Sequence, residues 1–315
     1  MHAPALDIAT TESAWPPSNV VARLPGSLPM GGVVPDTPIH AFATEAPQLV
    51  LRRDGAAVPT RHEIDLGGLL AFEIRGLLHA VEADAIVEAS ERFGYHDEAP
   101  GIQTPPGMRM NKSVHWVADA GLLEPMFERM AHLLPVQIDG WRLDPRLSRR
   151  LNMYRYDDGD VFNRHTDGDW PGFGLSDDRR TMVQWPGLRS CLTMLVYLNG
   201  PEDGVRGGQT RLFRPDGSVY DVTPSKGSAL FFRHGFGPGS ILHIGAPVRG
   251  PVAKYVARIN VFTPQPDWLS TPEPPPDECR GPGVNSCVGK KGTVELHFRQ
   301  STAAGDRQLL GIPFG

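Results

Sequence analysis

Six short apolar segments separated by turn residues dominate the second half of this sequence. They are LNMYRY, SCLTMLVYL, QTRLF, SALFF, SILHI and AKYVARINVF, with breaks such as DDGD, RPDG and GFGPG between them. Glycine supplies backbone angles that tight turns need, and proline, asparagine and aspartate favour turn positions. Because no helical pattern lies between these segments, the sequence predicts a mainly β fold, either a sandwich or a barrel.

Two helices are expected ahead of these strands. Residues 81–95, VEADAIVEASERFGY, carry apolar side chains at helical spacing and reach a candidate cap at Gly94. Residues 121–135, GLLEPMFERMAHLLP, repeat the pattern and stop at Pro135. The simplest role for both helices is packing against a sheet, so the prediction is a mainly β protein with flanking helices.

Composition divides the chain into three parts. Residues 1–60 are rich in Pro, Ala and Thr without a sustained period, so we expect an arm that wraps the domain or is partly disordered. Residues 61–263 carry the helix and strand patterns and are expected to form one domain. Residues 264–315 are again rich in Pro and Gly and are expected to form a C-terminal extension, in which the run VELHFR could add an edge strand.

Charge, hydropathy and cysteine content exclude several classes of protein. The net charge of −5 argues against general affinity for nucleic acid, which favours a basic face. No stretch is long and apolar enough to span a bilayer, and the N-terminus has neither the basic start nor the apolar core of a secretory signal. The three cysteines fit a reduced cytosol, although a disulfide between Cys279 and Cys287 stays open. We therefore expect a cytoplasmic protein without nucleic-acid or membrane partners; the sequence does not indicate its oligomeric state.

A His-x-Asp motif follows the first strand-like segment. In LNMYRYDDGDVFNRHTDGDWP, His165 and Asp167 are two positions apart. Residues i and i+2 of an extended chain point to the same side, so an imidazole nitrogen and a carboxylate oxygen can converge on one point. A second histidine would complete the two-histidine, one-carboxylate set of non-heme Fe(II) oxygenases, which leaves three metal positions open.

Two histidines are candidates for the missing ligand. His234 follows SALFF beside GFGPG and is expected at a strand end or in a loop, whereas His243 lies within the alternating segment SILHIGAPV. The strand after His243 places Lys254 and Arg258 on one face. Cations on an inner face are costly unless they meet an anion, and a metal-bound keto acid with a free carboxylate would supply one. His243 is therefore favoured over His234.

With these pieces together, residues 72–262 resemble the Fe(II)/2-oxoglutarate-dependent dioxygenases, in particular the prolyl 4-hydroxylase-like branch. The matching pieces occur in the family's order: the first helix, YRYDDGDVFNRHTDG, LTMLVYLN, GGQTRLF, GSALFF, and LHIGAPV followed by KYVARINVF. The resemblance implies a double-stranded β-helix core of the jelly-roll or cupin-like type. It also implies Fe(II) as cofactor, with 2-oxoglutarate and O2 as cosubstrates.

The resemblance assigns roles to individual residues. It implies that the iron ligands are His165, Asp167 and His243, and that Tyr197 binds the far carboxylate of 2-oxoglutarate while Tyr156 lines the cosubstrate pocket. The family usually has a Lys or Arg about ten positions after the distal histidine. Lys254 follows His243 by eleven positions and Arg258 by fifteen, so Lys254 is favoured as the partner of 2-oxoglutarate and Arg258 is its rival. One of the two cations could instead hold substrate.

The expected activity is oxidation of an unactivated C–H bond, with succinate and CO2 as products. Related halogenases lack the carboxylate ligand, so Asp167 favours an oxygenase. The contrasting hypothesis is a β-helix domain that has lost turnover and serves binding alone. Retention of all three ligands together with a cation favours the enzyme.

The segment GDWPGFGLSDDRRTMVQWPGLRSCL suggests where substrate binds. It is longer than a simple link between strands, so we expect a lid-like loop over the metal. Its candidate substrate contacts are Trp170, Trp185, Arg179 and Arg189, because aromatic rings offer apolar walls and an arginine can grip a carboxylate. These residues favour a small carboxylate-bearing substrate such as an amino acid, short peptide or natural-product intermediate. The alternative is a prolyl residue in a protein.

Overall fold

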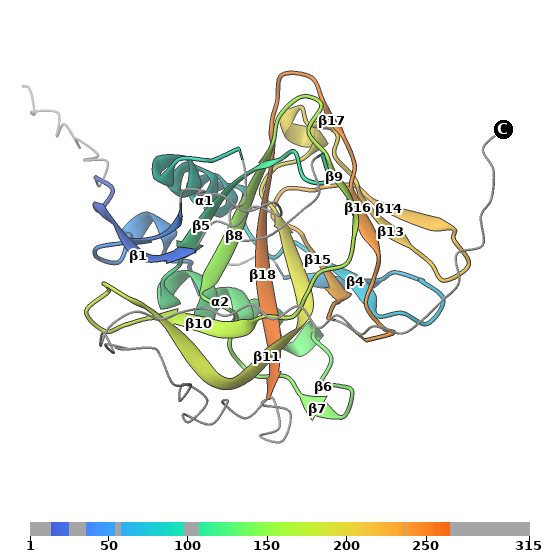
Figure 1. The fold of residues 1–315 in the computed structure, drawn as a ribbon, viewed down its shortest axis with the longest axis horizontal. Coiled ribbons are helices and arrows are strands. Elements are labelled where there is room, and N and C mark those ends of the chain that lie inside the picture. Colours follow the sequence, from blue (N-terminus) through green and yellow to red (C-terminus); the bar gives the residue numbers. More distant parts are fainter. Residues whose placement is uncertain (1–13, 25–35, 54–57, 98–106, 236, 265–315) are drawn as a thin grey trace, which may run out of the picture. The chain divides into compact units, whose positions relative to one another are not determined.

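Strands predominate in the part of the chain that the computed structural model describes, which is residues 14–24, 36–53, 58–97, 107–235 and 237–264. Two α-helices accompany them, α1 (Ala80–Phe93) and α2 (Ala120–Met130), as Figure 1 shows. Three short 3-10 turns are η1 (Pro47–Leu49), η2 (Ala131–Leu133) and η3 (Pro201–Asp203). Neither α-helix reaches the length and apolar character that a membrane crossing would need.

One large sheet forms the framework. Its strands lie in the order β1 (Ser18–Leu24), β2 (Thr37–Phe42), β5 (Lys112–Val117), β8 (Arg150–Tyr156), β18 (Lys254–Pro264), β11 (Met182–Tyr197), β15 (Ala229–Arg233), β4 (Ala71–Arg75) and β3 (Thr60–Glu63), and β10 (Pro171–Leu175) pairs with β11. Neighbouring strands are antiparallel except β2 and β5, which are parallel. The central strands β8, β18 and β11 are those that the sequence predicted from LNMYRY, AKYVARINVF and SCLTMLVYL.

A smaller sheet faces this framework. It has the order β14 (Val219–Val222), β13 (Thr210–Phe213), β16 (His243–Gly245) and β9 (Phe162–His165). Two further strand pairs are β12 (Arg206–Gly207) with β17 (Val248–Arg249), and β6 (Gln137–Ile138) with β7 (Trp141–Arg142). Two facing sheets with antiparallel central strands are the architecture of the predicted double-stranded β-helix, which is thereby confirmed.

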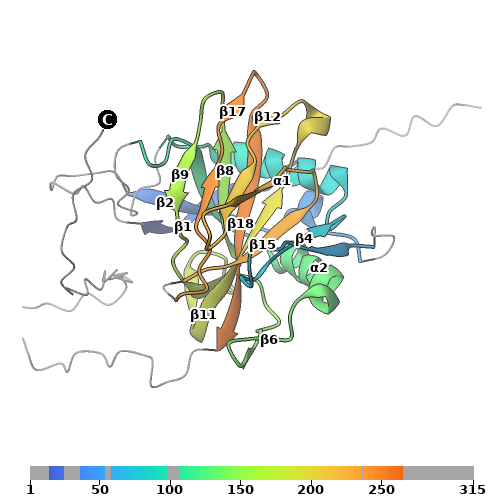
Figure 2. The ribbon, with the colours of Figure 1, turned by 90° about the vertical axis from the view of Figure 1, so that its right-hand side faces the viewer.

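Alternation along the central strands builds a core on each side of the large sheet. On β18, Ala257, Ile259 and Val261 join a core that includes buried residues of α1 and α2. Val256 lies on the opposite face, in a second core that includes Leu212 of the small sheet. We call this opposite side the inner face. Figure 2 shows α1 and α2 on one side of β18 and β9 on the other.

The two helices are where the sequence predicted them. Helix α1 buries Ile86 and Phe93 on one side and ends before Gly94, whose φ of 81° suits glycine. An ion pair joins the helices: Arg129 of α2 donates to both carboxylate oxygens of Glu82 of α1 at 2.7 Å each. A bidentate contact thus ties the two helices to each other.

One sequence expectation was wrong. The segment after Asp167 is not an irregular loop, because β10 and β11 form an antiparallel hairpin in which Gly172 pairs with Trp185. A Cβ atom added to Gly172 or Gly174 would lie 2.9 or 2.7 Å from the indole of Trp185. The glycines that suggest a loop in the sequence therefore leave room for this ring across the hairpin.

The terminal parts of the chain are described only in part. Within residues 14–53, strands β1 and β2 extend the large sheet, and Phe42 and Leu49 are buried in the helix-side core. The VELHFR run and both Cys279 and Cys287 lie outside the described residues. The division of the chain near residues 60 and 263 stays a prediction.

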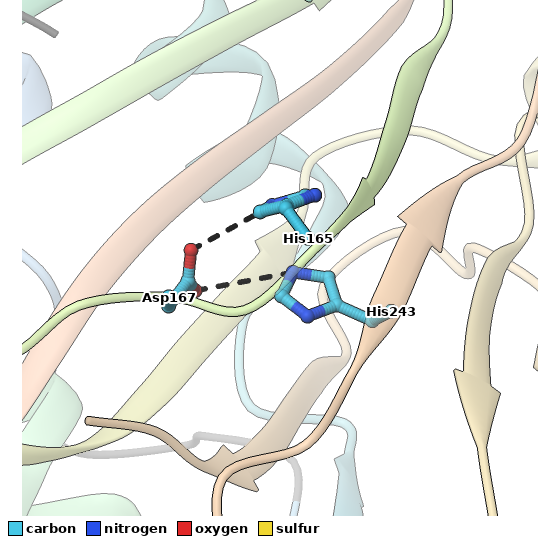
Figure 3. Close-up of side chains that lie close together, drawn as sticks. All are labelled: His165, Asp167 and His243. Atoms are coloured by element: carbon cyan, nitrogen blue, oxygen red, sulfur yellow. Dashed lines mark ion pairs between the residues drawn. The ribbon is translucent and has the colours of Figure 1, made fainter. Parts of the chain in front are cut away.

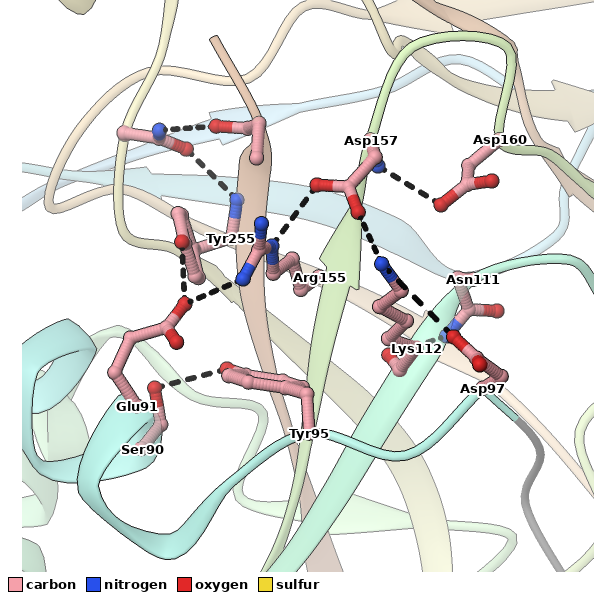
Figure 4. A network of polar contacts seen from close by, with 12 residues as sticks. Ser90, Glu91, Tyr95, Asp97, Asn111, Lys112, Arg155, Asp157, Asp160 and Tyr255 are labelled. Atoms are coloured by element: carbon pink, nitrogen blue, oxygen red, sulfur yellow. Dashed lines mark hydrogen bonds and ion pairs between the residues drawn. The ribbon is translucent and has the colours of Figure 1, made fainter.

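A polar network holds the turn between β8 and β9 (Figure 4). Asp157 accepts hydrogen bonds from Lys112 of β5 at 2.7 Å and from Arg155 of β8 at 2.9 Å. Arg155 also contacts Glu91 of α1 at 3.3 Å, and the Asp157 backbone N–H donates to Asp160 at 2.8 Å. This turn leads directly into β9, whose last residue is His165, so the network helps to position the site.

Candidate active site

The small sheet brings the predicted metal ligands together (Figure 3). His165 ends β9, His243 begins β16, and the two are cross-strand partners. Asp167 lies two positions beyond His165, and its Oδ1 is 3.7 Å from His165 Nε2 while its Oδ2 is 4.0 Å from His243 Nε2. Among the His, Cys, Asp and Glu side chains of the described residues, these three form the group whose donor atoms lie within 4.8 Å of one another.

Backbone carbonyls fix the orientation of both imidazoles. His165 Nδ1 is 2.6 Å from the Asn163 carbonyl, and His243 Nδ1 is 3.1 Å from the Ile241 carbonyl. Each Nδ1–H therefore donates, which leaves the Nε2 lone pair free to bind a metal. Burial lowers the pKa of His165 to about 3 and also lowers that of His243, so both rings are neutral at physiological pH.

Asp167 is held as a carboxylate. Its burial raises the pKa, but Arg258 and the neighbouring histidines outweigh burial and keep the pKa below its usual range. Oδ2 accepts hydrogen bonds from Thr193 Oγ1 at 2.6 Å and from Arg258 Nε at 3.1 Å. Oδ1 therefore remains available to a metal.

These residues fit a divalent first-row metal. Their donor atoms lie within 4.8 Å of one another, and imidazole nitrogens with a carboxylate oxygen are donors that such an ion prefers. Two neutral nitrogens and one carboxylate on one side of an ion are the facial set of non-heme Fe(II) oxygenases. His165, Asp167 and His243 would hold the metal.

His234, the alternative ligand, lies outside this group. Its two ring nitrogens are 2.7 Å from Ser190 Oγ and 2.7 Å from Thr193 Oγ1. Both nitrogens are thus used within the protein, and the structure brings His243 rather than His234 to the other two side chains.

A pocket opens beside the three side chains, and Lys254 is among the residues that line it. The Lys254 ammonium group is 2.5 Å from the Gly208 carbonyl and about 5 Å from two tyrosine ring centroids, those of Tyr156 (5.1 Å) and Tyr197 (5.4 Å). Burial lowers the pKa of Lys254 to about 7. Lys254 forms no ion pair with a carboxylate of the described residues, so it is suited to an incoming anion.

Comparison with known proteins agrees with this geometry. Residues 151–262 match the model of the 2OG-Fe(II) oxygenase superfamily. Residues 151–262 therefore form a 2OG-Fe(II) oxygenase domain. Its chemistry is that of an Fe(II)/2-oxoglutarate-dependent dioxygenase, which uses Fe(II), 2-oxoglutarate and O2. No curated protein matches the sequence.

Several solved structures resemble this oxygenase. A viral collagen prolyl hydroxylase from Paramecium Bursaria Chlorella virus-1 is 21% identical, covering 63% of this chain and 98% of its own, with a TM-score of 0.42. A Pseudomonas putida prolyl-4-hydroxylase is 18% identical (64% and 96% covered, TM-score 0.39). A Trichoplax adhaerens prolyl hydroxylase, in complex with a hypoxia inducible factor peptide fragment, is 17% identical (63% and 86% covered, TM-score 0.43). Likenesses this distant do not identify the substrate of this chain.

The two tyrosines that the sequence assigned to the cosubstrate, Tyr156 and Tyr197, occupy different positions relative to the pocket. Tyr156 lines it, whereas Tyr197 is fully buried and donates its hydroxyl hydrogen bond to Thr210 Oγ1 at 2.8 Å. Thr210, which does line the pocket, was missed from the sequence. The usable signal was alternation in QTRLF, which puts Thr210 on the same face as the buried Leu212.

Arg258 and Lys254 both line the pocket but have different partners. Arg258 already contacts Asp167, whereas Lys254 contacts only a backbone carbonyl and aromatic rings among the described residues. This difference supports the sequence preference for Lys254 as the partner of 2-oxoglutarate.

The structure does not bring the four candidate substrate contacts into the pocket lining. Trp185 packs across the hairpin glycines, and Trp170 lies 5.1 Å from the guanidinium of Arg150. Arg179 bonds to Asp119 at 2.6 Å and to the Phe42 carbonyl. Arg189 pairs with Asp169 at 2.6 Å. Their roles in substrate binding stay predictions.

Proposed function

We propose that this oxygenase hydroxylates, or otherwise oxidises, an unactivated C–H bond of a small carboxylate-bearing substrate. The observation that carries the proposal is a second buried cation in the pocket: Arg258 lines it in addition to Lys254, and Arg258 Nη2 has no hydrogen-bond partner among the described residues. One 2-oxoglutarate needs one cation for its far carboxylate. Because Arg258 already pairs with Asp167 through Nε, its unpartnered Nη2 donor favours a further acceptor such as a substrate carboxylate.

The metal group and the pocket divide the work. His165, Asp167 and His243 would hold Fe(II), which supplies the oxidising chemistry when 2-oxoglutarate and O2 are bound. Lys254 and Thr210 hold the far carboxylate of 2-oxoglutarate by a charge-assisted hydrogen bond and a hydroxyl contact. For hydroxylation, substrate, 2-oxoglutarate and O2 give hydroxylated substrate, succinate and CO2.

Apolar side chains limit water in the pocket. Leu195 and Val256 line it, and the Phe162 ring stacks on His165 with centroids 3.6 Å apart. Such walls strengthen the electrostatic contacts inside and protect a reactive centre from unproductive reactions. They also offer apolar contact to the carbon skeleton of a substrate.

The first test is anaerobic titration with Fe(II) and 2-oxoglutarate, observed through the metal-to-ligand charge-transfer band. Appearance of the band, followed by succinate on admission of O2, is expected of the working enzyme. Absence of both would leave the binding-domain hypothesis.

The second test compares substrates. Free amino acids and other small carboxylates should stimulate succinate formation and gain one oxygen atom by mass spectrometry. Stimulation by prolyl peptides with blocked C-termini, and not by small carboxylates, would instead support hydroxylation of a prolyl residue in a protein, which the family resemblance implies.

A further inference from the structure

Two arginine side chains with unpartnered donors lie at the pocket: Arg258 of β18 lines it, and Arg109, whose backbone bridges to Phe162 of β9, packs on two rings of its lining. Arg258 Nε donates to Asp167, while its buried Nη2 has no hydrogen-bond partner in the described part of the chain. Arg109 Nη2 is also buried and unpartnered there, and its guanidinium lies 4.7 Å from the Tyr154 ring centroid and 5.0 Å from that of Phe162. Both rings line the pocket.

A third arginine shares the inner face of the large sheet with Arg258. Arg150 is on β8, on the same inner face as Tyr154, and is only 5% exposed. Its Nε has no partner among the described residues, and its guanidinium lies 5.1 Å from Trp170 and 5.6 Å from Phe173. Burial lowers the pKa of Arg150 to about 10, and the charge of Arg258 acts in the same direction. We call Arg109, Arg150 and Arg258 the arginine cluster.

The protein supplies too little negative charge for the arginine cluster. Asp167 is the carboxylate that pairs with Arg258, and neither Arg109 nor Arg150 forms an ion pair with a described residue. When iron is bound, Asp167 also shares its charge with the metal. Aromatic faces compensate part of the cost of burying the guanidinium groups, but an anion would compensate more.

The arginine cluster is separate from the end of the pocket that suits 2-oxoglutarate. Arg258 and Lys254 are four residues apart on one strand, or about 13 Å at the usual rise. Lys254 pairs across the sheet with Tyr156, whereas Arg258 pairs with Asn152. A 2-oxoglutarate molecule that has its far carboxylate at Lys254 therefore leaves the arginine cluster open.

A neighbouring acceptor is also unpartnered. Asn260 follows Arg258 by two positions on β18, so both side chains lie on the inner face. Asn260 Oδ1 is buried and has no hydrogen-bond partner among the described residues. Free donors beside a free acceptor match a ligand that carries a carboxylate and, next to it, an ammonium or hydroxyl group.

We infer that the arginine cluster binds the free carboxylate of the substrate, and that Asn260 accepts a hydrogen bond from an ammonium or hydroxyl group of the same molecule. Guanidinium groups can bind a carboxylate with two parallel hydrogen bonds, which fixes its orientation as well as its position. Since this assignment rests on the proposed function, its test measures loading with iron and 2-oxoglutarate separately from substrate binding.

The test uses the twenty free amino acids, small hydroxy acids, and the corresponding carboxamides as probes. The full chain is first loaded anaerobically with Fe(II) and 2-oxoglutarate, and each probe is then titrated against the charge-transfer band. At least one acid should bind ten or more times as tightly as its carboxamide. In Arg109→Gln and in Arg150→Gln, the acid and its carboxamide should have dissociation constants within twofold of each other. Arg109→Lys should keep part of the preference for the acid.

A matched control separates this site from general surface charge. Arg211→Gln removes an exposed arginine of β13 that pairs with Asp221, and the acid preference should not change. If loading and O2-dependent succinate formation fail, the proposed function itself is wrong. If loading succeeds but no acid binds more tightly than its carboxamide, or the preference survives in both glutamine variants, the arginine cluster does not recognise a substrate carboxylate.

Discussion

At the scale of single residues, three side chains decide whether the centre can work. His165→Ala, Asp167→Ala and His243→Ala each remove one donor from a group whose donor atoms lie within 4.8 Å. We expect each variant to lose turnover while its circular dichroism spectrum stays near that of the parent. Retained succinate formation in His243→Ala would remove this residue from the metal set.

His234 has a different role that the hydrogen bonds define. Thr193 Oγ1 donates to Asp167, so it must accept from His234 Nδ1–H, and His234 Nε2 then accepts from Ser190. This order positions the Asp167 carboxylate through Thr193 and keeps the His234 ring neutral.

We therefore predict that His234→Ala weakens metal binding about 10- to 100-fold, as removal of such supporting partners typically does. Saturating Fe(II) should restore most turnover. His132 of the 3-10 turn η2 is exposed, so His132→Ala is the matched control. Equal Fe(II) affinity in the two variants would show that His234 only fills space.

The pKa of Lys254 gives a pH dependence with a definite sign. Burial lowers this pKa to about 7, so the ammonium form that pairs with 2-oxoglutarate predominates below pH 7 and is lost above it. The dissociation constant of 2-oxoglutarate should rise as pH increases from 6.5 to 8.5, by up to about tenfold per unit. Lys254→Arg keeps its charge and should flatten the profile. A pH-independent constant in the parent would mean that another group binds the carboxylate.

At the scale of elements, alternation made the strands and the His-x-Asp pair predictable. The two-residue period of a strand is enough to place His165 beside Asp167 and to put Lys254 and Arg258 on one face. The β10–β11 hairpin escaped prediction because its glycines, needed where Trp185 crosses the backbone, have the composition of a loop. Thr210 was not predicted for another reason: its hydrogen bond from Tyr197 depends on how strands far apart in the sequence pack together.

The contact between α1 and α2 gives an element-scale prediction. Arg129 and Glu82 are nearly buried, with side chains 6% and 10% exposed. Burial raises the pKa of Glu82, but the Arg129 hydrogen bonds outweigh it and lower the pKa, so the pair stabilises the fold above the unfolded pKa of Glu and less as pH falls. Arg129→Leu leaves a buried carboxylate unpaired and should cost about 3 kcal/mol of unfolding free energy at pH 7.

Urea denaturation at pH 7 measures this loss. Arg53 pairs with Glu128 on the exposed side of the same helix, so Arg53→Leu is the control and should cost less than about 1 kcal/mol. Similar losses in both variants would mean that burial of the Arg129 pair is unimportant.

At the scale of the whole molecule, the site joins strands that are far apart in sequence. The pocket is lined from β8, β11 and β18 of the large sheet and from β9, β13 and β16 of the small one. A ligand that binds all of them binds the folded state and has no comparable site in the unfolded chain. Mn(II), a redox-inactive substitute for Fe(II), together with 2-oxoglutarate should therefore raise the unfolding free energy by about 2.7 kcal/mol at one hundred times the dissociation constant.

The contribution of each sheet to ligand binding can be tested separately through the melting temperature. Mn(II) alone should raise the melting temperature of the parent, and 2-oxoglutarate should add to this only when the metal is present. In Lys254→Ala the metal shift should persist while the added shift of 2-oxoglutarate is lost, because the cation that holds its far carboxylate comes from the large sheet. In His243→Ala both shifts should disappear, because this ligand comes from the small sheet. If 2-oxoglutarate still raised the melting temperature of Lys254→Ala beyond the Mn(II) effect, the cosubstrate would bind elsewhere in the pocket. Arg258 would then be the favoured partner of its far carboxylate.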